Sequence, residues 1–388
     1  MAMASLTWQQ VNAWRLSQHA LSPRLKRKDF LEAVTRTGGI QAQVLSAAEL
    51  ALWARVDGLT REDVQSALWQ DRTLVKTWAM RGTLHLMRAA DLPLYVAARS
   101  ADEIRDWLKY FTYYGISEAQ YKAFMAAVPQ VLSSEPLTRE QLASAVAKHT
   151  GVPELEKLLL ASSWGSLWKP SAWRGDLCFG PNQGRNVTFV NPHLWLGPNA
   201  KQDRQPAEPY AALQETARRY LRAYGPATPE DFARWWDGSA GIVPAKKLFR
   251  SIEDELETVD VEGWQAFSLR ATVEPMQKLE AQGEAQEVVR LLPLFDAYTL
   301  GLGRDIEPIL PRAYKSRVFR PQGWVSAVVL VDGRMEGVWD YEVRPSQTTV
   351  RVRMFASPAA STHEAIEAEA ERLNAFLNTR VVLKFESL

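Results

Sequence analysis

The stretch Gly38-Gly39-Ile40-Gln41-Ala42-Gln43-Val44 is short and uncharged, and both of its flanks have helical patterns. Residues 29–37 carry apolar side chains at helical spacing, and a glycine pair is typical of the position just after a helix. Downstream, a capping-box pattern predicts that a new helix begins at Ser46. The two glutamines therefore fall in a connector. If the connector is extended, Gln41 and Gln43 point the same way and offer two amide groups to one place.

The same capping pattern recurs along the first two-thirds of the chain. It predicts helix starts at Thr7, Thr60, Thr138 and, with a proline at the first helical position, Thr228. Strand-like segments follow these helices at residues 73–87, 176–190 and 256–269. The last segment has the alternation and the glycine-containing turn of a β-hairpin. Helices followed by a hairpin, three times over, are typical of tandem winged helices.

Three motifs occur in order along the chain. They are Gln41-Ala42-Gln43 after a glycine, Thr77-Trp78-Ala79-Met80-Arg81-Gly82-Thr83-Leu84-His85, and Leu291-Leu292-Pro293-Leu294-Phe295-Asp296-Ala297-Tyr298. Through them the chain, from about Thr7 onward, resembles the AlkZ-type family of winged-helix DNA glycosylases. The resemblance implies an α+β fold, with three tandem winged-helix units followed by a C-terminal β-rich, barrel-like domain, C-shaped overall.

Stretches rich in proline, glycine and polar residues suggest domain boundaries for this fold. We expect winged helix 1, with the Gln-x-Gln site, in residues 1–90, winged helix 2 in 91–190, a linker in 191–209, winged helix 3 in 210–272 and the C-terminal domain in 273–388. In the C-terminal domain, Asp332-Gly333 predicts a hairpin turn. A helix at 362–377 and a last strand at 380–385 follow, and that strand would cover an edge of the sheet.

Bulk properties limit the function classes. The 388 residues carry a formal charge of +1, which by itself gives DNA binding no support. The single cysteine, Cys178, excludes an intrachain disulfide and fits a reducing cytoplasm. No apolar run reaches the length of a membrane span, and the N-terminus lacks a secretion signal. The five histidines are scattered, so we expect no metal site. We expect a cytoplasmic monomer without a cofactor.

A glutamine pair suits only one kind of bond cleavage. An amide does not titrate, so it cannot act as a general base. Two converging carbonyl oxygens can hold a water molecule and stabilise positive charge. That is sufficient only when the leaving group departs easily, as N7-alkylated guanine does because alkylation makes the base cationic. The sugar then develops oxocarbenium character. The alternative is that Gln41 and Gln43 only cap the ends of two helices.

The resemblance assigns catalysis to Gln41 and Gln43. It implies a monofunctional DNA glycosylase that hydrolyses the N-glycosidic bond of N7-alkylated purines, including bulky adducts and interstrand crosslinks. The partner is double-stranded DNA carrying alkylated purines, and we expect little base flipping, since a crosslinked base cannot leave the duplex freely. A related subgroup has Asp at the second position, so Gln43 points toward the crosslink-unhooking, antibiotic-resistance type. The alternative is a non-catalytic winged-helix DNA-binding protein or transcriptional regulator.

Two basic clusters are candidates for phosphate contacts. The first, before the connector, contains Arg24, Lys26, Arg27 and Lys28, and the second contains Arg312, Lys315 and Arg317 interleaved with aromatic residues. Either cluster could instead be only a solvated face.

Three further polar residues lie in the motifs. Arg81, at a predicted turn, could reach a phosphate. His85 lies in the next strand, where it could contact DNA or serve as a hydrogen-bonded structural residue. Asp296 is a lone carboxylate in an apolar stretch, and we expect it to cap a helix or to pair with an arginine such as Arg304.

Overall fold

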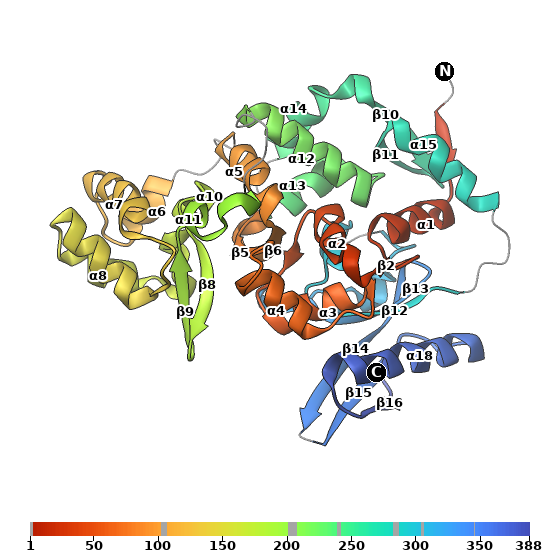
Figure 1. The fold of residues 1–388 in the computed structure, drawn as a ribbon. Coiled ribbons are helices and arrows are strands. Elements are labelled where there is room, and N and C mark those ends of the chain that lie inside the picture. The colour runs from red at the N-terminus through yellow and green to blue at the C-terminus, as the bar shows by residue number, and fades with distance from the viewer. Residues whose placement is uncertain are drawn as a thin grey trace. The chain divides into compact units, whose positions relative to one another are not determined.

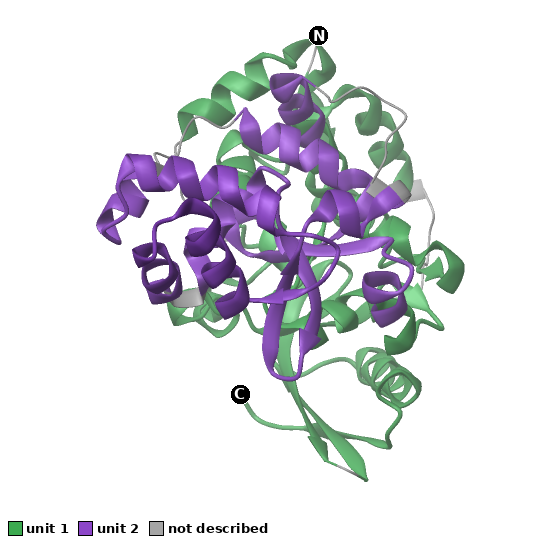
Figure 2. Cartoon of the chain, turned by 60° about the vertical axis from the view of Figure 1, so that its left-hand side comes forward, with its two compact units in different colours: residues 1–64, 217–388 green, residues 65–216 purple. Residues whose placement is uncertain are grey.

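The computed structural model describes residues 3–101, 107–200, 208–238, 242–281, 287–303, 306–344 and 346–388. Figure 1 shows the fold, and the chain forms two compact units. Unit 1 contains Met1–Val64 and Ala217–Leu388, and unit 2 contains Gln65–Thr216 (Figure 2). Unit 1 is therefore discontinuous in sequence.

Unit 1 begins with short helices and very short strands. They are β1 (Ala4–Leu6), α1 (Trp8–Gln18), β2 (Leu25–Lys26), the 3₁₀ turn η1 (Arg27–Asp29), α2 (Phe30–Arg36), β3 (Ile40–Gln41), α3 (Leu45–Trp53) and β4 (Val56–Asp57). The next helix, α4 (Arg61–Trp69), carries the chain into unit 2. The connector with the glutamines thus lies between α2 and α3, as predicted.

Four of the predicted helix caps are confirmed. Thr7, Thr138 and Thr228 each form a reciprocal capping box with the residue three positions later. At the fourth, the Asp63 N–H donates to Thr60 Oγ1 at 3.3 Å, and the Thr60 N–H donates to Asp63 Oδ2 at 2.9 Å. These local patterns therefore fix where the helices begin.

The fifth predicted cap, at Ser46, is wrong. Helix α3 begins at Leu45 after the N-cap residue Val44, and no side chain caps it. Glu49, the other half of the predicted box, is buried and pairs with Arg61 Nε at 3.5 Å. The helix thus starts one residue earlier than predicted, and Glu49 forms an ion pair with Arg61 instead of the second half of a capping box.

The second part of unit 1 has helices followed by a hairpin. They are α12 (Pro209–Tyr224), whose last turns belong to unit 1, α13 (Pro229–Asp237), α14 (Ile242–Arg250), β10 (Leu256–Val261), β11 (Trp264–Leu269) and α15 (Arg270–Gln277). Glu262 (φ 50°) and Gly263 (φ 92°) form the hairpin turn, as predicted. Strand β1 pairs in parallel with β10 and completes a three-stranded sheet.

Unit 2 opens with a hairpin, and a series of helices then leads to a second hairpin. Its strands are β5 (Leu74–Trp78), β6 (Leu84–Arg88), β7 (Leu137–Thr138), β8 (Cys178–Gln183) and β9 (Asn186–Val190). Its helices are α5 (Leu92–Ser100), α6 (Trp107–Tyr113), α7 (Glu118–Val131), α8 (Arg139–Thr150), α9 (Glu154–Ala161), α10 (Lys169–Trp173) and α11 (Pro192–Trp195). The core is rich in aromatic residues, including Phe111, Phe124, Trp168 and Phe189. Helix α11 lies within the predicted linker, and residues 201–207 of that linker are outside the described part of the chain.

The C-terminal part of unit 1 is a five-stranded sheet in the order β12-β13-β14-β15-β16 (Figure 1). The strands are β12 (Val289–Leu292), β13 (Ala327–Val331), β14 (Arg334–Arg344), β15 (Gln347–Met354) and β16 (Val381–Phe385), and helix α18 (Ala360–Leu377) contacts β12 and β16. The Asp332-Gly333 turn is confirmed, and β16 covers the edge of β15 as expected.

The expected barrel-like closure is wrong. In the described residues the sheet is open, with β12 and β16 as its two outer strands. Helix α18 lies against both outer strands and buries Ile366, Leu373 and Phe376. Covering by a helix protects a sheet without the need to join its edge strands.

Candidate active site

The end of α2 fixes where the glutamine connector begins. Gly38 (φ 71°) and Gly39 (φ 107°) adopt conformations that favour glycine. The Gly39 N–H donates to the Val34 carbonyl at 2.9 Å, and the Gly38 N–H donates to the Thr35 carbonyl at 3.2 Å. This pair of bonds is a Schellman motif, which ends the helix and turns the chain sharply.

A distant tyrosine holds the same turn. The hydroxyl of Tyr224, in α12, donates to the Thr37 carbonyl at 2.8 Å. The Tyr224 ring is buried and stacks on Tyr220 at a centroid distance of 5.1 Å. A Cβ atom at Gly301 would lie 1.9 Å from the Tyr224 ring, so this position requires glycine. The start of the connector is therefore fixed by a contact that spans 187 residues of sequence.

The two glutamines differ in exposure. Gln41 ends the short strand β3 and is 7 % exposed, whereas Gln43 is exposed and lies in a bend. The extended run is therefore shorter than expected, because the chain already bends at Gln43 and Val44. A group that touches DNA must be accessible, and Gln43 is the more accessible amide of the two.

A buried ion pair fixes the far end of α3. The guanidinium of Arg55, two residues after the helix, contacts both carboxylate oxygens of Asp296 at 2.7 and 2.8 Å, and both side chains are fully buried. Asp296 also caps α16 (Ala297–Gly301) by accepting from the Tyr298 N–H at 2.8 Å. The expectation that Asp296 caps a helix and pairs with an arginine is thus confirmed. Arg304, which we suggested as that arginine, lies outside the described residues.

A neutral histidine lies beside this ion pair. The His19 ring contacts the edges of Tyr224 and Tyr298 at centroid distances of 4.7 and 5.1 Å. Burial, and then the nearby guanidinium groups of Arg55 and Arg15, lower the pKa of His19 well below its usual value. At neutral pH His19 therefore adds no charge beside the Arg55–Asp296 pair.

Within the first basic cluster, Arg24 differs from its neighbours. It forms an ion pair with Glu369 of α18 and donates to the Ala54 carbonyl at 3.1 Å, so its guanidinium is engaged inside unit 1. Lys26, Arg27 and Lys28 are exposed, and Arg27 pairs with Asp63 at 2.7 Å. Lys26 and Lys28 form no ion pair within the described residues.

Arg81 and His85 form one hydrogen-bonded group in unit 2. Arg81 (φ 58°) lies in the turn between β5 and β6, and its guanidinium is 3.5 Å from His85 Nε2. His85 is buried, and its Nδ1 lies 3.0 Å from the Thr83 carbonyl. Burial, and then Arg81, lower the pKa of His85 to about 3. The geometry fits a neutral ring that donates from Nδ1 to Thr83 and accepts from Arg81.

The second basic cluster forms a short helical segment in the C-terminal part of unit 1. Arg312 begins the 3₁₀ turn η8 (Arg312–Tyr314), and Lys315 and Arg317 lie in α17 (Lys315–Val318). Arg312 and Arg317 are exposed, and Lys315 is half-buried. In the neighbouring sheet, Arg351 and Arg353 instead pair with Asp340 at 3.1 and 2.7 Å.

Sequence reasoning missed Tyr224 and Arg55 as the residues that support the connector. Their partners are 187 and 241 residues away, and no local pattern signals such contacts. Among the described residues, no group of three or more His, Cys, Asp and Glu side chains is placed to hold a metal ion. Within the same residues, no helix combines the length and apolarity needed to cross a membrane.

Known proteins share both the sequence and the fold. The family model "DNA glycosylase AlkZ-like" matches residues 34–376. An interstrand DNA cross-link repair glycosylase of Streptomyces sahachiroi is 38 % identical over 375 residues, which cover 95 % of this chain and 98 % of that protein. The solved structure of the Streptomyces sahachiroi DNA glycosylase AlkZ superposes with a TM-score of 0.85 and 34 % sequence identity, over 98 % of this chain and 100 % of that one.

The mixed α+β fold and these matches define a DNA glycosylase, a hydrolase of N-glycosyl bonds. The chain belongs to the AlkZ-like DNA glycosylase family. The alternative of a non-catalytic DNA-binding protein or regulator is therefore set aside.

Proposed function

We propose that this glycosylase removes N7-alkylated purines from double-stranded DNA, including bulky adducts and purines joined in interstrand crosslinks. The relative from Streptomyces sahachiroi, whose name specifies interstrand crosslink repair, is similar over nearly the whole chain. The chemistry of a glutamine pair supports the same substrate class. Without a titratable acid or base, it can assist only a leaving group that is already cationic.

Gln43 and Gln41 have different roles in this proposal. The exposed amide of Gln43 contacts the sugar and the attacking water, and its carbonyl oxygen stabilises the oxocarbenium ion. The more buried Gln41 orients the water or Gln43. The observation that carries the proposal is the fixed backbone around an accessible amide, since Tyr224 holds the start of the connector and the Arg55–Asp296 pair holds the far end of the helix that follows it. Preorganised dipoles stabilise developing charge without reorganising during the reaction.

The proposed DNA contacts use cations that the structure leaves accessible. Lys26, Lys28 and Arg27 on the segment before the connector would bind phosphates, as would Arg312 and Arg317. In addition, Lys315 and Arg81 would position the duplex, with His85 acting through Arg81. We assign no contact to Arg24, because Glu369 already engages its guanidinium.

The fold proposal is three tandem winged helices within residues 1–90, 91–190 and 210–272, with a β-rich domain in 273–388. Two of the hairpins support it. In a winged helix, the short strand after the first helix pairs with the second strand of the hairpin. Strand β7, after α7, pairs with β9 in this way, and Ala227, after α12, pairs with Phe267 of β11.

The catalytic assignment is tested with duplex DNA containing N7-methylguanine under single-turnover conditions. We expect the Gln41→Ala/Gln43→Ala variant to excise the base at least about 10²-fold more slowly than wild type, the cost of losing one preorganised polar group. The released product should be an abasic strand that breaks only after alkali, as expected of a monofunctional enzyme. A crosslinked duplex should be unhooked by the wild type.

Gln9→Ala is the matched control, because Gln9 is an exposed glutamine on α1 of the same unit. It should excise N7-methylguanine at the wild-type rate. Circular dichroism and thermal unfolding show whether each variant is folded. A folded double variant with wild-type excision would refute the catalytic role of the glutamines.

A further inference from the structure

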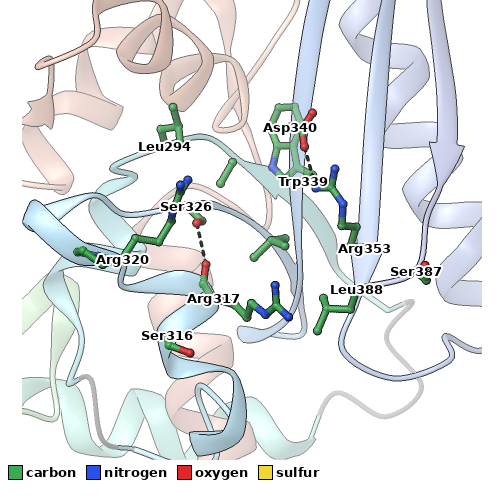
Figure 3. A pocket seen from close by; sticks show the side chains of 13 residues that line it. Leu294, Ser316, Arg317, Arg320, Ser326, Trp339, Asp340, Arg353, Ser387 and Leu388 are labelled. Carbon is green, nitrogen blue, oxygen red and sulfur yellow. Dashed lines mark hydrogen bonds and ion pairs between the residues drawn. The ribbon is translucent and has the colours of Figure 1, made fainter.

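A second candidate site lies in the C-terminal part of unit 1. A pocket of about 450 Å³ separates the α17 segment from the five-stranded sheet. Its apolar wall includes Leu294, Ala327 and Val338. Figure 3 shows Arg317 and Arg320 on one side of the pocket and Arg353 on the strand at the other side. This volume lies in the range of pockets that hold small molecules.

Cationic side chains outnumber anionic ones in the lining of the pocket. Among the lining residues are three arginines and one aspartate. Asp340 accepts from Arg353 at 2.7 Å, and Glu386 also pairs with Arg353, at 2.9 Å. In the described part of the chain, the guanidinium groups of Arg317 and Arg320 have no ion-pair or hydrogen-bond partner. A pocket with two unsatisfied guanidinium groups favours an anion.

The backbone that carries these arginines is well fixed. Ser326 Oγ donates to the Arg317 carbonyl at 2.7 Å, and the Arg320 N–H donates to the Trp324 carbonyl at 2.8 Å. These bonds fix the backbone of the two exposed arginines, which are three residues apart and line the pocket. Little backbone order would therefore be lost when a ligand binds.

We propose that this pocket binds one nucleotide unit, with its phosphate between Arg317 and Arg320 and its base or sugar against the apolar wall. Arginine forks match the geometry of phosphate, and the neighbouring apolar surface suits the remainder of a nucleotide. The excised base carries no anionic group and would not use these arginines. The nucleotide can come from a DNA strand or from the free nucleotide pool. The proposal deepens the glycosylase function, on which it rests for DNA as the source.

Equilibrium dialysis with the full chain tests the pocket. The probes are 2′-deoxyadenosine 5′-monophosphate, deoxyadenosine and inorganic phosphate. We expect the monophosphate to bind at least about tenfold more tightly than either fragment. Arg317→Ala/Arg320→Ala should weaken its binding by at least about tenfold. The matched control is Arg380→Ala/Lys384→Ala, which removes two exposed cations from the same part of unit 1 and should bind as wild type does.

Competition separates the two sources. If DNA supplies the nucleotide, a duplex with a short single-stranded overhang should displace the monophosphate from the wild type. If free nucleotide is the ligand, the duplex should leave the monophosphate bound. The pocket proposal is overturned if the monophosphate does not bind at roughly millimolar concentration, or binds equally to the Arg317→Ala/Arg320→Ala variant. Excision of N7-methylguanine by the wild type is scored separately, so failure of the pocket and failure of the glycosylase assignment give different results.

Discussion

The connector at Gln41–Gln43 and the segment at Arg81–His85 are both family-like motifs, but different contacts hold them. Long-range contacts support the connector, through Tyr224 at its start and the Arg55–Asp296 pair at the far end of α3, the helix that follows it. The segment at Arg81–His85 has short-range hydrogen bonds instead: the Ala79 N–H donates to the Thr83 carbonyl at 3.0 Å, and His85 Nδ1 lies 3.0 Å from the same carbonyl.

The two motifs also place their polar side chains differently. The connector leaves Gln43 exposed, whereas the segment buries His85 as a neutral ring. Under the proposed function, the exposed Gln43 would serve chemistry, whereas the buried His85 would serve the stability of a turn. Changes at each motif should then affect different measurements.

The largest expected effect is on the support of the connector. Asp296→Ala leaves the Arg55 charge buried and unpaired, so we expect a loss of about 3–5 kcal/mol in the free energy of unfolding. Urea denaturation measures this loss. Lys122→Ala is the control, since it breaks an exposed ion pair with Glu118 and should cost no more than about 0.5 kcal/mol. Equal losses in the two variants would show that the buried pair is not a support.

The next effect is the contribution of His85 to the pH dependence of the free energy of unfolding. Its folded-state pKa of about 3 is below the unfolded value of about 6.5, so folding keeps the ring neutral. The resulting stability is fully present above pH 6.5 and is lost as the pH falls toward 3. Between pH 7 and pH 5, wild type should lose about 2 kcal/mol more than His85→Asn in urea denaturation. Parallel pH profiles would mean that folding does not lower the pKa of His85.

A smaller effect distinguishes a hydrogen bond that positions the connector from one that only stabilises the fold. Tyr224→Phe removes the bond to the Thr37 carbonyl, and Tyr298→Phe removes an equally buried bond to the Gly333 carbonyl at 2.9 Å. Each should cost about 1.5 kcal/mol in the free energy of unfolding. Only Tyr224→Phe should slow excision of N7-methylguanine, and mainly in the single-turnover rate at saturating enzyme. If both variants excise equally fast, the Thr37 bond does not position the connector.

The smallest effect is the difference in stability between losing the confirmed helix cap at Thr138 and changing Ser46, where the predicted cap is absent. Thr138→Ala removes the N-cap of α8 and should cost about 1 kcal/mol. Ser46→Ala changes a residue inside the first turn of α3, so the free energy of unfolding should change by less than about 0.5 kcal/mol. Thermal unfolding of the two variants under one condition measures the difference. A larger loss from Ser46→Ala would restore Ser46 as a cap.

Local signals predicted much of the fold. The caps at Thr7, Thr138 and Thr228 and the turn at Asp332-Gly333 depend on hydrogen bonds and backbone angles within a few residues, and all are confirmed. Ser46 has the same pattern, but tertiary packing pairs Glu49 with Arg61 instead. Openness of the C-terminal sheet also depends on packing, because α18 covers its outer strands.

The candidate site was predictable to a lesser extent. Two glutamines between two helices can be read from the sequence, but their unequal exposure cannot, since it depends on where the chain bends. The residues that fix the connector are hundreds of positions away. The engagement of Arg24 by Glu369 likewise joins residues 345 apart, so composition alone cannot separate this arginine from its exposed neighbours.

The discontinuity of unit 1 has a consequence for synthesis. Gln41 and Gln43 leave the ribosome early, but Tyr224 and Asp296 are made only after the whole of unit 2. Arg55 precedes its partner by 241 residues, which at roughly 5–20 residues per second is a delay on the order of tens of seconds. A nascent chain thus carries the two glutamines well before these contacts can hold the connector in place, so we expect base excision only after translation is nearly complete.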